Sequence, residues 1–519
     1  MMPFQIVVLW SDLLVWLLFA AALGLALLAR RSPPLASAWQ RVGASRPGMA
    51  AATVLLCFAL VGLLDSLHYR LRLPAANGPA GAGSQASAQY AVEVLSLLDA
   101  LATPLRTRNE KTYSAPFATR LLAKETREVA GVGTVREQPR LKYGGAHLGE
   151  REAEVAADVG FTAFRYAALG FLGWALLTLA LLSHLRRRAL ALAASAEYRP
   201  QMARPVAPEA GAKAPVFTVD RESGQKPALP GAWALLRGAA GGAGGAAGGS
   251  LAWDAVLAVL LLLALLLPPL FALAGDYHVF GTDKVGQDVL YQVLKSIRTG
   301  LIIGLVTTLV MLPLAVLLGI AAGYFRGWVD DLIQYLYTVL NSIPGVLLIA
   351  AAVLMMQVVI DTHPQWFATA AERADLRLLA LCAILGVTSW TGLCRLLRGE
   401  TLKLRELEYI QAAQAFGVSH ARIIGRHILP NLMHIVVIAL VMDFSGLVLA
   451  EAVLSYVGIG VDPTMTSFGT MINNARLELG REPVVWWSLA AAFATMFVLV
   501  LAANLFADAV RDAFDPRMQ

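Results

Sequence analysis

Two acidic residues, Asp443 and Glu451, lie within or beside a long apolar segment. A carboxylate in such surroundings is energetically costly and by default indicates a functional group. A pair of this kind could relay protons. A carboxyl that accepts hydrogen bonds between helices, or lines a polar cavity, would satisfy the same pattern. The sequence favours this second interpretation and leaves the proton relay open.

The segment GTDKVGQDVL (281–290) holds two glycines, two aspartates and a threonine: Gly281, Thr282, Asp283, Gly286 and Asp288. Asp and Gly at this spacing could bind a cation, but the full calcium-loop pattern is missing. The spacing alone leaves a cation site open.

Other patterns argue against a metal site or an enzyme. Three histidines are candidate metal ligands, but they do not have the HxxxH or HExxH spacing of a metal site: His363, His427 and His434. The three cysteines have no CxxC spacing: Cys57, Cys382 and Cys394. The chain has no GxxxxGK[ST] or GxSxG motif, so we expect no ATP site, no cofactor and no catalysis in this chain.

Residues 411–431 (QAAQAFGVSHARIIGRHILPN) form a polar, basic interruption between two apolar segments. The pattern predicts a short helix, a turn at Gly417 and a second short helix. Pro430 lacks an N–H and fits the first turn of the next helix. A loop built in this way is suited to press, as a rigid knob, into a soluble partner.

These segments belong to an all-α polytopic membrane protein. Of 519 residues, 57% are hydrophobic and 15% are charged, and several apolar runs exceed the roughly 18–20 residues that cross a bilayer. The net charge of +6 is explained by basic loops rather than by nucleic acid. We predict about nine spans, at 5–29, 49–67, 159–184, 251–274, 297–323, 333–358, 377–396, 432–456 and 484–507.

The basic loops fall on one side of the membrane if the N-terminus lies outside and the C-terminus in the cytoplasm. The sequence then divides into parts: two helices in 1–67, an outer loop or domain at 68–158, a third helix at 159–188, a disordered cytoplasmic linker at 189–250, and a six-span module at 251–519. The linker prediction rests on a Gly/Ala/Pro-rich composition with few large apolar residues.

Six segments occur in an order that resembles a known family. They are GTDKVGQDVL (281–290), AGYFRGWVD (322–330), NSIPGVLL (341–348), the 411–431 loop, EAVLSYVGIGVDP (451–463) and NLFADAVRDAFDPR (504–517). Together they resemble inner-membrane permease subunits of ATP-binding-cassette (ABC) importers, of the dipeptide and oligopeptide (DppC/OppC) type. The resemblance covers about 251–517 and implies a six-helix type I permease core, to which three N-terminal helices are added.

The resemblance also implies roles for individual residues. Residues 397–431 would hold the coupling loop, with its EAA motif, that docks on a separate ATPase. Its matching positions are Ala412, Ala413, Gly417, Leu429 and Pro430, whereas Gln411 replaces the usual acidic residue. The 281–288 segment would be a turn near the outer gate, where Gln287 replaces a familiar Arg. Glu451 matches an acidic position of the family, and Asp443 matches none.

The implied function is one half of the translocation pathway of a bacterial importer for short peptides, in the inner membrane. The implied partners are a homologous permease, one or two ATPase subunits that bind the ATP, a periplasmic solute-binding protein and membrane lipid. Two alternatives remain: a proton-coupled carrier or channel that uses Asp443 and Glu451, and a sensor or assembly protein that acts through 68–158.

Overall fold

The computed structural model describes residues 4–29, 33–73, 90–129, 133–149, 151–197, 251–367 and 369–514. The predicted linker at 189–250 lies outside these residues from position 198 onward.

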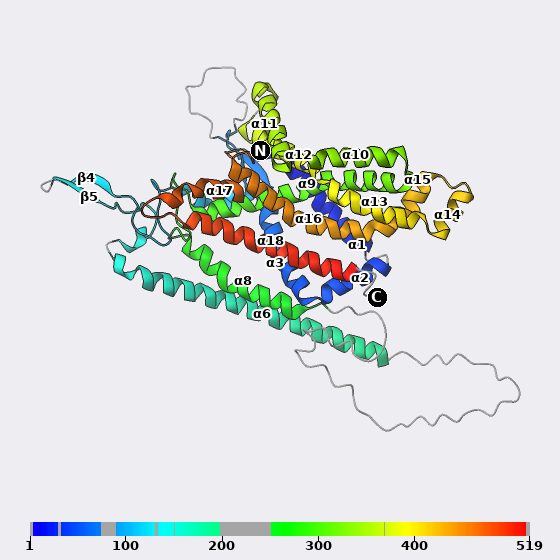
Figure 1. Cartoon of the computed structure of the whole chain (residues 1–519). Coiled ribbons are helices and arrows are strands. Elements are labelled where there is room, and N and C mark those ends of the chain that lie inside the picture. The colour runs from blue at the N-terminus through cyan, green and yellow to red at the C-terminus, as the bar shows by residue number, and fades with distance from the viewer. Residues whose placement is uncertain are drawn as a thin grey trace, which may run out of the picture.

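Residues 4–197 form what we call the N-terminal unit (Figure 1). Its long helices are α1 (Trp10–Ala29), α2 (Pro33–Ala44), α3 (Arg46–Asp65) and α6 (Val155–Glu197). Its short elements are β1 (Phe4–Val7), β2 (His68–Leu71), β3 (Leu95–Ser96), α4 (Leu97–Leu101), α5 (Thr103–Thr107), β4 (Glu125–Val129), β5 (Gly133–Glu137), η1 (Ala146–Leu148) and η2 (Glu152–Glu154). Strands β1, β2 and β3 form an antiparallel sheet, and β4 and β5 form a separate hairpin.

Residues 251–514 form a helical bundle. Its elements are α8 (Trp253–Leu273), α9 (Val289–Phe325), α10 (Trp328–Ser342), α11 (Gly345–Thr362), η4 (Pro364–Trp366), α12 (Ala370–Ser389), α13 (Thr391–Arg405), α14 (Glu408–Ala415), α15 (His420–Ile423), the π-helical turn η5 (Ile424–Ile428), α16 (Leu429–Val457), α17 (Phe468–Arg476), η6 (Glu478–Gly480) and α18 (Trp487–Phe514). In Figure 1 the molecule has two ends, which we name the α17 end and the α14 end after the helices that lie there.

The all-α membrane fold is confirmed, with a difference in the number of spans. Among the described residues, seven helices are long and apolar enough to cross a membrane, and eight are if α12 and α13, which meet at a 40° bend, count as one. The span predicted at 333–358 is broken at Pro344, because proline supplies no N–H to continue a helix. Its first part, α10, is a separate amphipathic helix. The predicted span at 5–29 corresponds to α1, whose apolar part, Trp10–Gly24, is shorter than the others.

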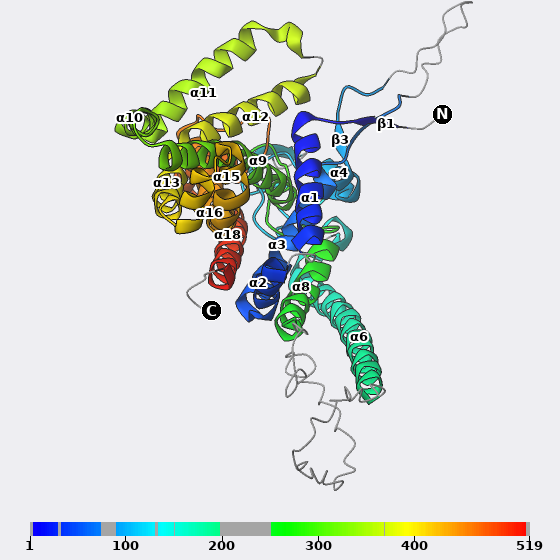
Figure 2. The same cartoon turned by 90° about the vertical axis from the view of Figure 1, so that its right-hand side faces the viewer.

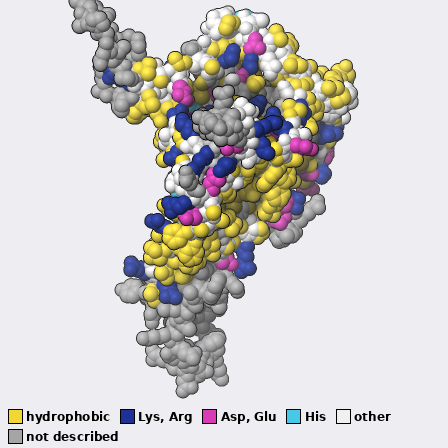
Figure 3. Space-filling view, turned by 90° about the vertical axis from the view of Figure 1, so that its left-hand side faces the viewer, with side chains coloured by type: hydrophobic (Ala, Val, Ile, Leu, Met, Phe, Trp, Pro, Cys, Tyr) yellow, Lys and Arg dark blue, Asp and Glu magenta, His cyan; other side chains and the backbone are white. Residues whose placement is uncertain are grey.

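The N-terminal unit packs along the side of the bundle formed by α8, α9 and α18. Helix α3 contacts all three of these helices, and α6 lies along α8 (Figure 1). At the α14 end, Ala38 and Val42 of α2 are buried against Val510 and Phe514 of α18. Viewed from the α17 end, Lys, Arg, Asp and Glu gather in the centre of the face, and apolar side chains dominate below it (Figure 3). This distribution suits a polar end that emerges from an apolar slab.

Candidate functional site

The 411–431 loop contains the predicted turn. Helix α14 ends at Ala415, and Gly417 has a φ of 73°, in the left-handed region that glycine adopts without strain. No atom lies within 4 Å of the point where a Cβ would stand. Glycine is therefore required here by backbone conformation and not by lack of space.

The second half of the loop differs from the prediction. It is not a separate short helix, because α15, η5 and α16 run on as one helical segment from His420 to Val457. Pro430 is the second residue of α16 and follows directly on the π-helical turn. Within a regular helix its ring would clash with the carbonyl four residues earlier. The wider π turn changes the backbone at that place, which allows the helix to continue.

Buried side chains fix the loop to the rest of the bundle. Ile410, Ile423 and Ile428 are fully buried in a cluster formed with residues of α9 and α13. The Arg405 guanidinium donates a hydrogen bond of 2.5 Å to the carbonyl of Tyr324, at the end of α9. The Tyr324 hydroxyl lies 2.8 Å from His420 Nδ1. The loop and the end of α13 before it are thus attached to the end of α9.

The opposite face of the loop is exposed. Phe416, beside the turn, is 86% exposed, and Tyr409 and Leu407 are also exposed. Of the residues predicted for this loop, Gln411, Ala412, Gly417 and Pro430 are exposed, and Ala413 and Leu429 are half-buried. Gln411 donates to the carbonyl of Glu406 at 3.1 Å. A large apolar side chain on a firmly anchored loop is suited to protein contact.

The 281–288 segment is a turn whose carboxylates are already used. Asp283 accepts hydrogen bonds from the backbone N–H of Val285 at 3.0 Å and of Gln287 at 2.9 Å. Asp288 caps α9 by accepting from the N–H of Leu290 at 2.8 Å. Among the described residues, no group of three His, Cys, Asp or Glu could hold a metal ion.

The N-terminal unit lies directly on this turn, which sequence reasoning missed. Gly286 has a φ of 76°, and a Cβ there would stand 1.9 Å from the carbonyl oxygen of Glu110. The N–H of Glu110 donates to the carbonyl of Gly286 at 2.9 Å. The Thr282 hydroxyl accepts from the N–H of Ser114 at 2.7 Å and donates to the carbonyl of Thr112 at 2.9 Å. Partners some 170 positions apart leave no local signal in one sequence.

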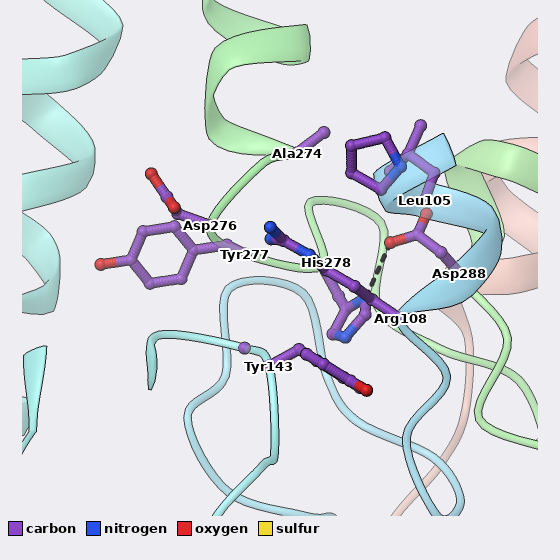
Figure 4. Close-up of a pocket in the computed structure, with 10 residues that line it drawn as sticks. Leu105, Arg108, Tyr143, Ala274, Asp276, Tyr277, His278 and Asp288 are labelled. Atoms are coloured by element: carbon purple, nitrogen blue, oxygen red, sulfur yellow. Dashed lines mark hydrogen bonds and ion pairs between the residues drawn. The ribbon is translucent and has the colours of Figure 1, made fainter. Parts of the chain in front are cut away.

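A buried histidine, His278, joins the two parts, and Figure 4 shows its contact with Asp288. His278 Nδ1 lies 2.7 Å from Asp288 Oδ2, and its Nε2 lies 3.5 Å from Glu110 Oε1. Burial alone would lower the pKa of His278, but the two carboxylates raise it to about 9. Burial alone would raise the pKa of Glu110, but hydrogen bonds from His278 and from the N–H groups of residues 142–144 lower it to about 2. The cluster therefore consists of a protonated His278 between two carboxylates, those of Glu110 and Asp288.

The two acidic residues of α16 have different surroundings. Glu451 is 1% exposed and accepts hydrogen bonds from Ser455 at 2.6 Å and from Ser467 at 2.8 Å. It therefore ties α16 to the start of α17. Asp443 is half-buried and has no hydrogen bond to another described residue. The two lie eight residues, or about 12 Å, apart along one helix, so they do not form a pair.

Comparisons with known proteins agree with these features. Residues 315–519 match the family described as "Binding-protein-dependent transport system inner membrane component". The oligopeptide transport system permease protein OppC of Mycobacterium tuberculosis is 31% identical over 253 residues, which are 49% of this chain and 79% of the relative. The glutathione transport system permease protein GsiD of Pectobacterium atrosepticum is 32% identical over 244 residues, 47% and 73% of the two chains. The dipeptide transport system permease protein DppC of Lactococcus lactis is 30% identical over 242 residues, 47% and 64% of the two chains.

Proposed function

The chain belongs to the family of binding-protein-dependent transport system inner membrane components, the permeases of ABC importers, and on this basis we propose that it forms one half of a peptide-translocation pathway. It is a multi-pass membrane protein. The proposed substrates are short peptides, since similar proteins are named as permeases for oligopeptides, dipeptides and glutathione.

We propose that the 411–431 loop transmits movement from a separate ATPase. The observation that carries this proposal is the combination of one strongly exposed phenylalanine, Phe416, with a loop in which Ile423 and Ile428 are fully buried in the bundle. An exposed aromatic group fills a groove on a partner, and a rigid mounting passes the displacement on to α9, α13 and α16.

The remaining partners and the orientation follow from the same role. A homologous permease completes the pathway, one or two ATPase subunits bind at the α14 end, and a solute-binding protein arrives at the α17 end. The α14 end is then cytoplasmic, with the C-terminus, and residues 68–158 lie outside, with the N-terminus. The 281–288 turn, from Gly281 to Asp288, is a structural element beside the outer gate.

The test is a substitution at the turn. Gly417→Val, or deletion of 412–417, should abolish peptide uptake and binding of the ATPase subunits, while the amount of protein in the membrane stays the same. Gly425→Val is the matched control, because Gly425 lies in the same loop in open space and has no positive φ. Uptake should persist in that control. Normal uptake by Gly417→Val would contradict the coupling role, and uptake driven by a proton gradient without nucleotide would contradict the importer.

A further inference from the structure

Helix α9 carries two cations one turn apart, Lys295 and Arg298, and both contact the N-terminal unit. Lys295 Nζ lies 2.6 Å from Asp65 of α3 and 3.1 Å from Asp99 of α4. These contacts, with the Arg46–Asp254 ion pair of 3.1 Å between α3 and α8, fasten the unit to the bundle at both ends. The unit is thus a fixed part of the side formed by α8, α9 and α18.

The second cation, Arg298, contacts a different helix of the N-terminal unit, α1. Arg298 Nη2 donates to Asp12 Oδ1 at 2.6 Å and to the hydroxyl of Ser11 at 2.9 Å, both at the start of α1. The Ser11 hydroxyl in turn donates to Asp375 on α12, and the Ser11 N–H donates to the same carboxylate at 3.1 Å. Ser11 is therefore the bridge between α9 and α12.

This bridge is closed to water. Ser11 is 0% exposed, Asp12 1% and Asp375 2%. Burial strengthens the interaction of these charges. If α12 moved away and Asp375 stayed buried without a partner, its carboxylate would be energetically costly. The contact is therefore stable in two arrangements. Asp375 is either buried and bound to Ser11, or separated from Ser11 and exposed to water.

Helix α12 is the element that this bridge holds against α1 and α9. It meets α13 at a 40° bend near Trp390. Helix α11 stands out from the rest of the molecule (Figure 2), whereas α12 packs on α9 through Leu378 and Leu381. At the α17 end, Val15 of α1 is buried beside Leu378 of α12 and Val353 of α11.

We infer that α1 is a latch on the gate, in which Ser11 holds Asp375 of α12 in the closed arrangement and releases it when the α17 end opens. This inference rests on the proposed transport function and adds to it a role for the N-terminal unit. Ser11 and Asp375 are positioning residues: they hold α12 and are not expected to touch the substrate.

The test is a reversible cross-link. In a parent variant in which alanine replaces Cys57, Cys382 and Cys394, the pair Ser11→Cys and Asp375→Cys is oxidised and uptake of a dipeptide into vesicles is measured with the full complex. The control is Thr126→Cys with Arg136→Cys, two exposed residues that lie opposite each other in the β4–β5 hairpin, wholly within the N-terminal unit. We expect at least a tenfold loss of uptake in the oxidised test pair, recovery on reduction, and uptake within twofold of the parent in the oxidised control.

Uptake at the parent rate by the cross-linked test pair would overturn the latch, as would failure of the two cysteines to cross-link. A parent that imports no peptide would instead count against the proposed function. A second variant covers misfolding of the pair. Ser11→Ala removes the bridging hydroxyl only, and it should raise ATP hydrolysis by the complex without binding protein at least twofold. An unchanged or lower rate of hydrolysis would contradict the latch.

Discussion

The cluster of His278, Glu110 and Asp288 should make docking of the segment at 103–145 depend on pH. In the folded protein the pKa of His278 is about 9, against 6.5 for an ordinary histidine. The folded state therefore binds the proton more tightly than the unfolded state. The resulting stability is fully present below pH 6.5 and is lost as the pH rises through 9.

The magnitude follows from the two pKa values. The difference of roughly 2.5 units corresponds to about 3 kcal/mol, most of it present at pH 6 and almost none at pH 9.5. His278 is 4% exposed, so solvent screening reduces this value little. At pH 8 about half should remain.

The assay is pulse proteolysis of the purified protein in urea at pH 6, 8 and 9.5. Trypsin sites are available in the segment at Arg108, Lys111, Arg120, Lys124, Arg140 and Lys142. The free energy of unfolding should fall by about 3 kcal/mol from pH 6 to pH 9.5. His278→Asn keeps a donor near the Nδ1 position but carries no charge, so it should lose most of this dependence. Equal pH dependence in the two proteins would refute the reasoning.

Three further substitutions test separate parts of the argument. Phe416→Ala should weaken binding of the ATPase subunits about tenfold, measured by co-purification at graded concentrations, without loss of permease from the membrane. Gly286→Ala should cost about 1–3 kcal/mol or more in the urea assay, because its Cβ would overlap the carbonyl oxygen of Glu110; unchanged stability would contradict the close packing. Pro313→Ala restores an N–H in the middle of α9 and should slow uptake severalfold while raising thermal stability; an unchanged or faster rate of uptake would contradict a role of Pro313 in transport.

The predictable features of this chain are those with a local cause. Apolar runs indicated the helices, and the sequence around Gly417 indicated a turn, which the structure has. The break at Pro344 also had a local signal, but the apolar residues on both sides favoured one span. The π turn before Pro430 was not predicted: the proline is a local signal that a regular helix is disturbed there, but it does not say which form the disturbance takes.

The contacts of the N-terminal unit could not be predicted, for a physical reason. Each buried ion pair joins residues far apart in the chain, such as Asp12 with Arg298 and Asp65 with Lys295. A charge in an apolar segment indicates that a partner exists but not which residue it is. The sequence therefore showed that Asp443 and Glu451 needed an explanation. Only the fold separated Glu451, which accepts two hydrogen bonds, from Asp443, which has no partner in the part of the chain that the structure describes.

Helix α9 connects the two ends of the molecule. Its 37 residues span about 55 Å, with Lys295 and Arg298 near one end and Tyr324 near the other. The first end is attached to the N-terminal unit, and the second is attached to the 411–431 loop through Gln414 and His420. A displacement of the loop cannot carry the first end along without breaking buried ion pairs. It must therefore be absorbed between these ends, and Pro313, where the helix lacks one backbone hydrogen bond, lies in that stretch.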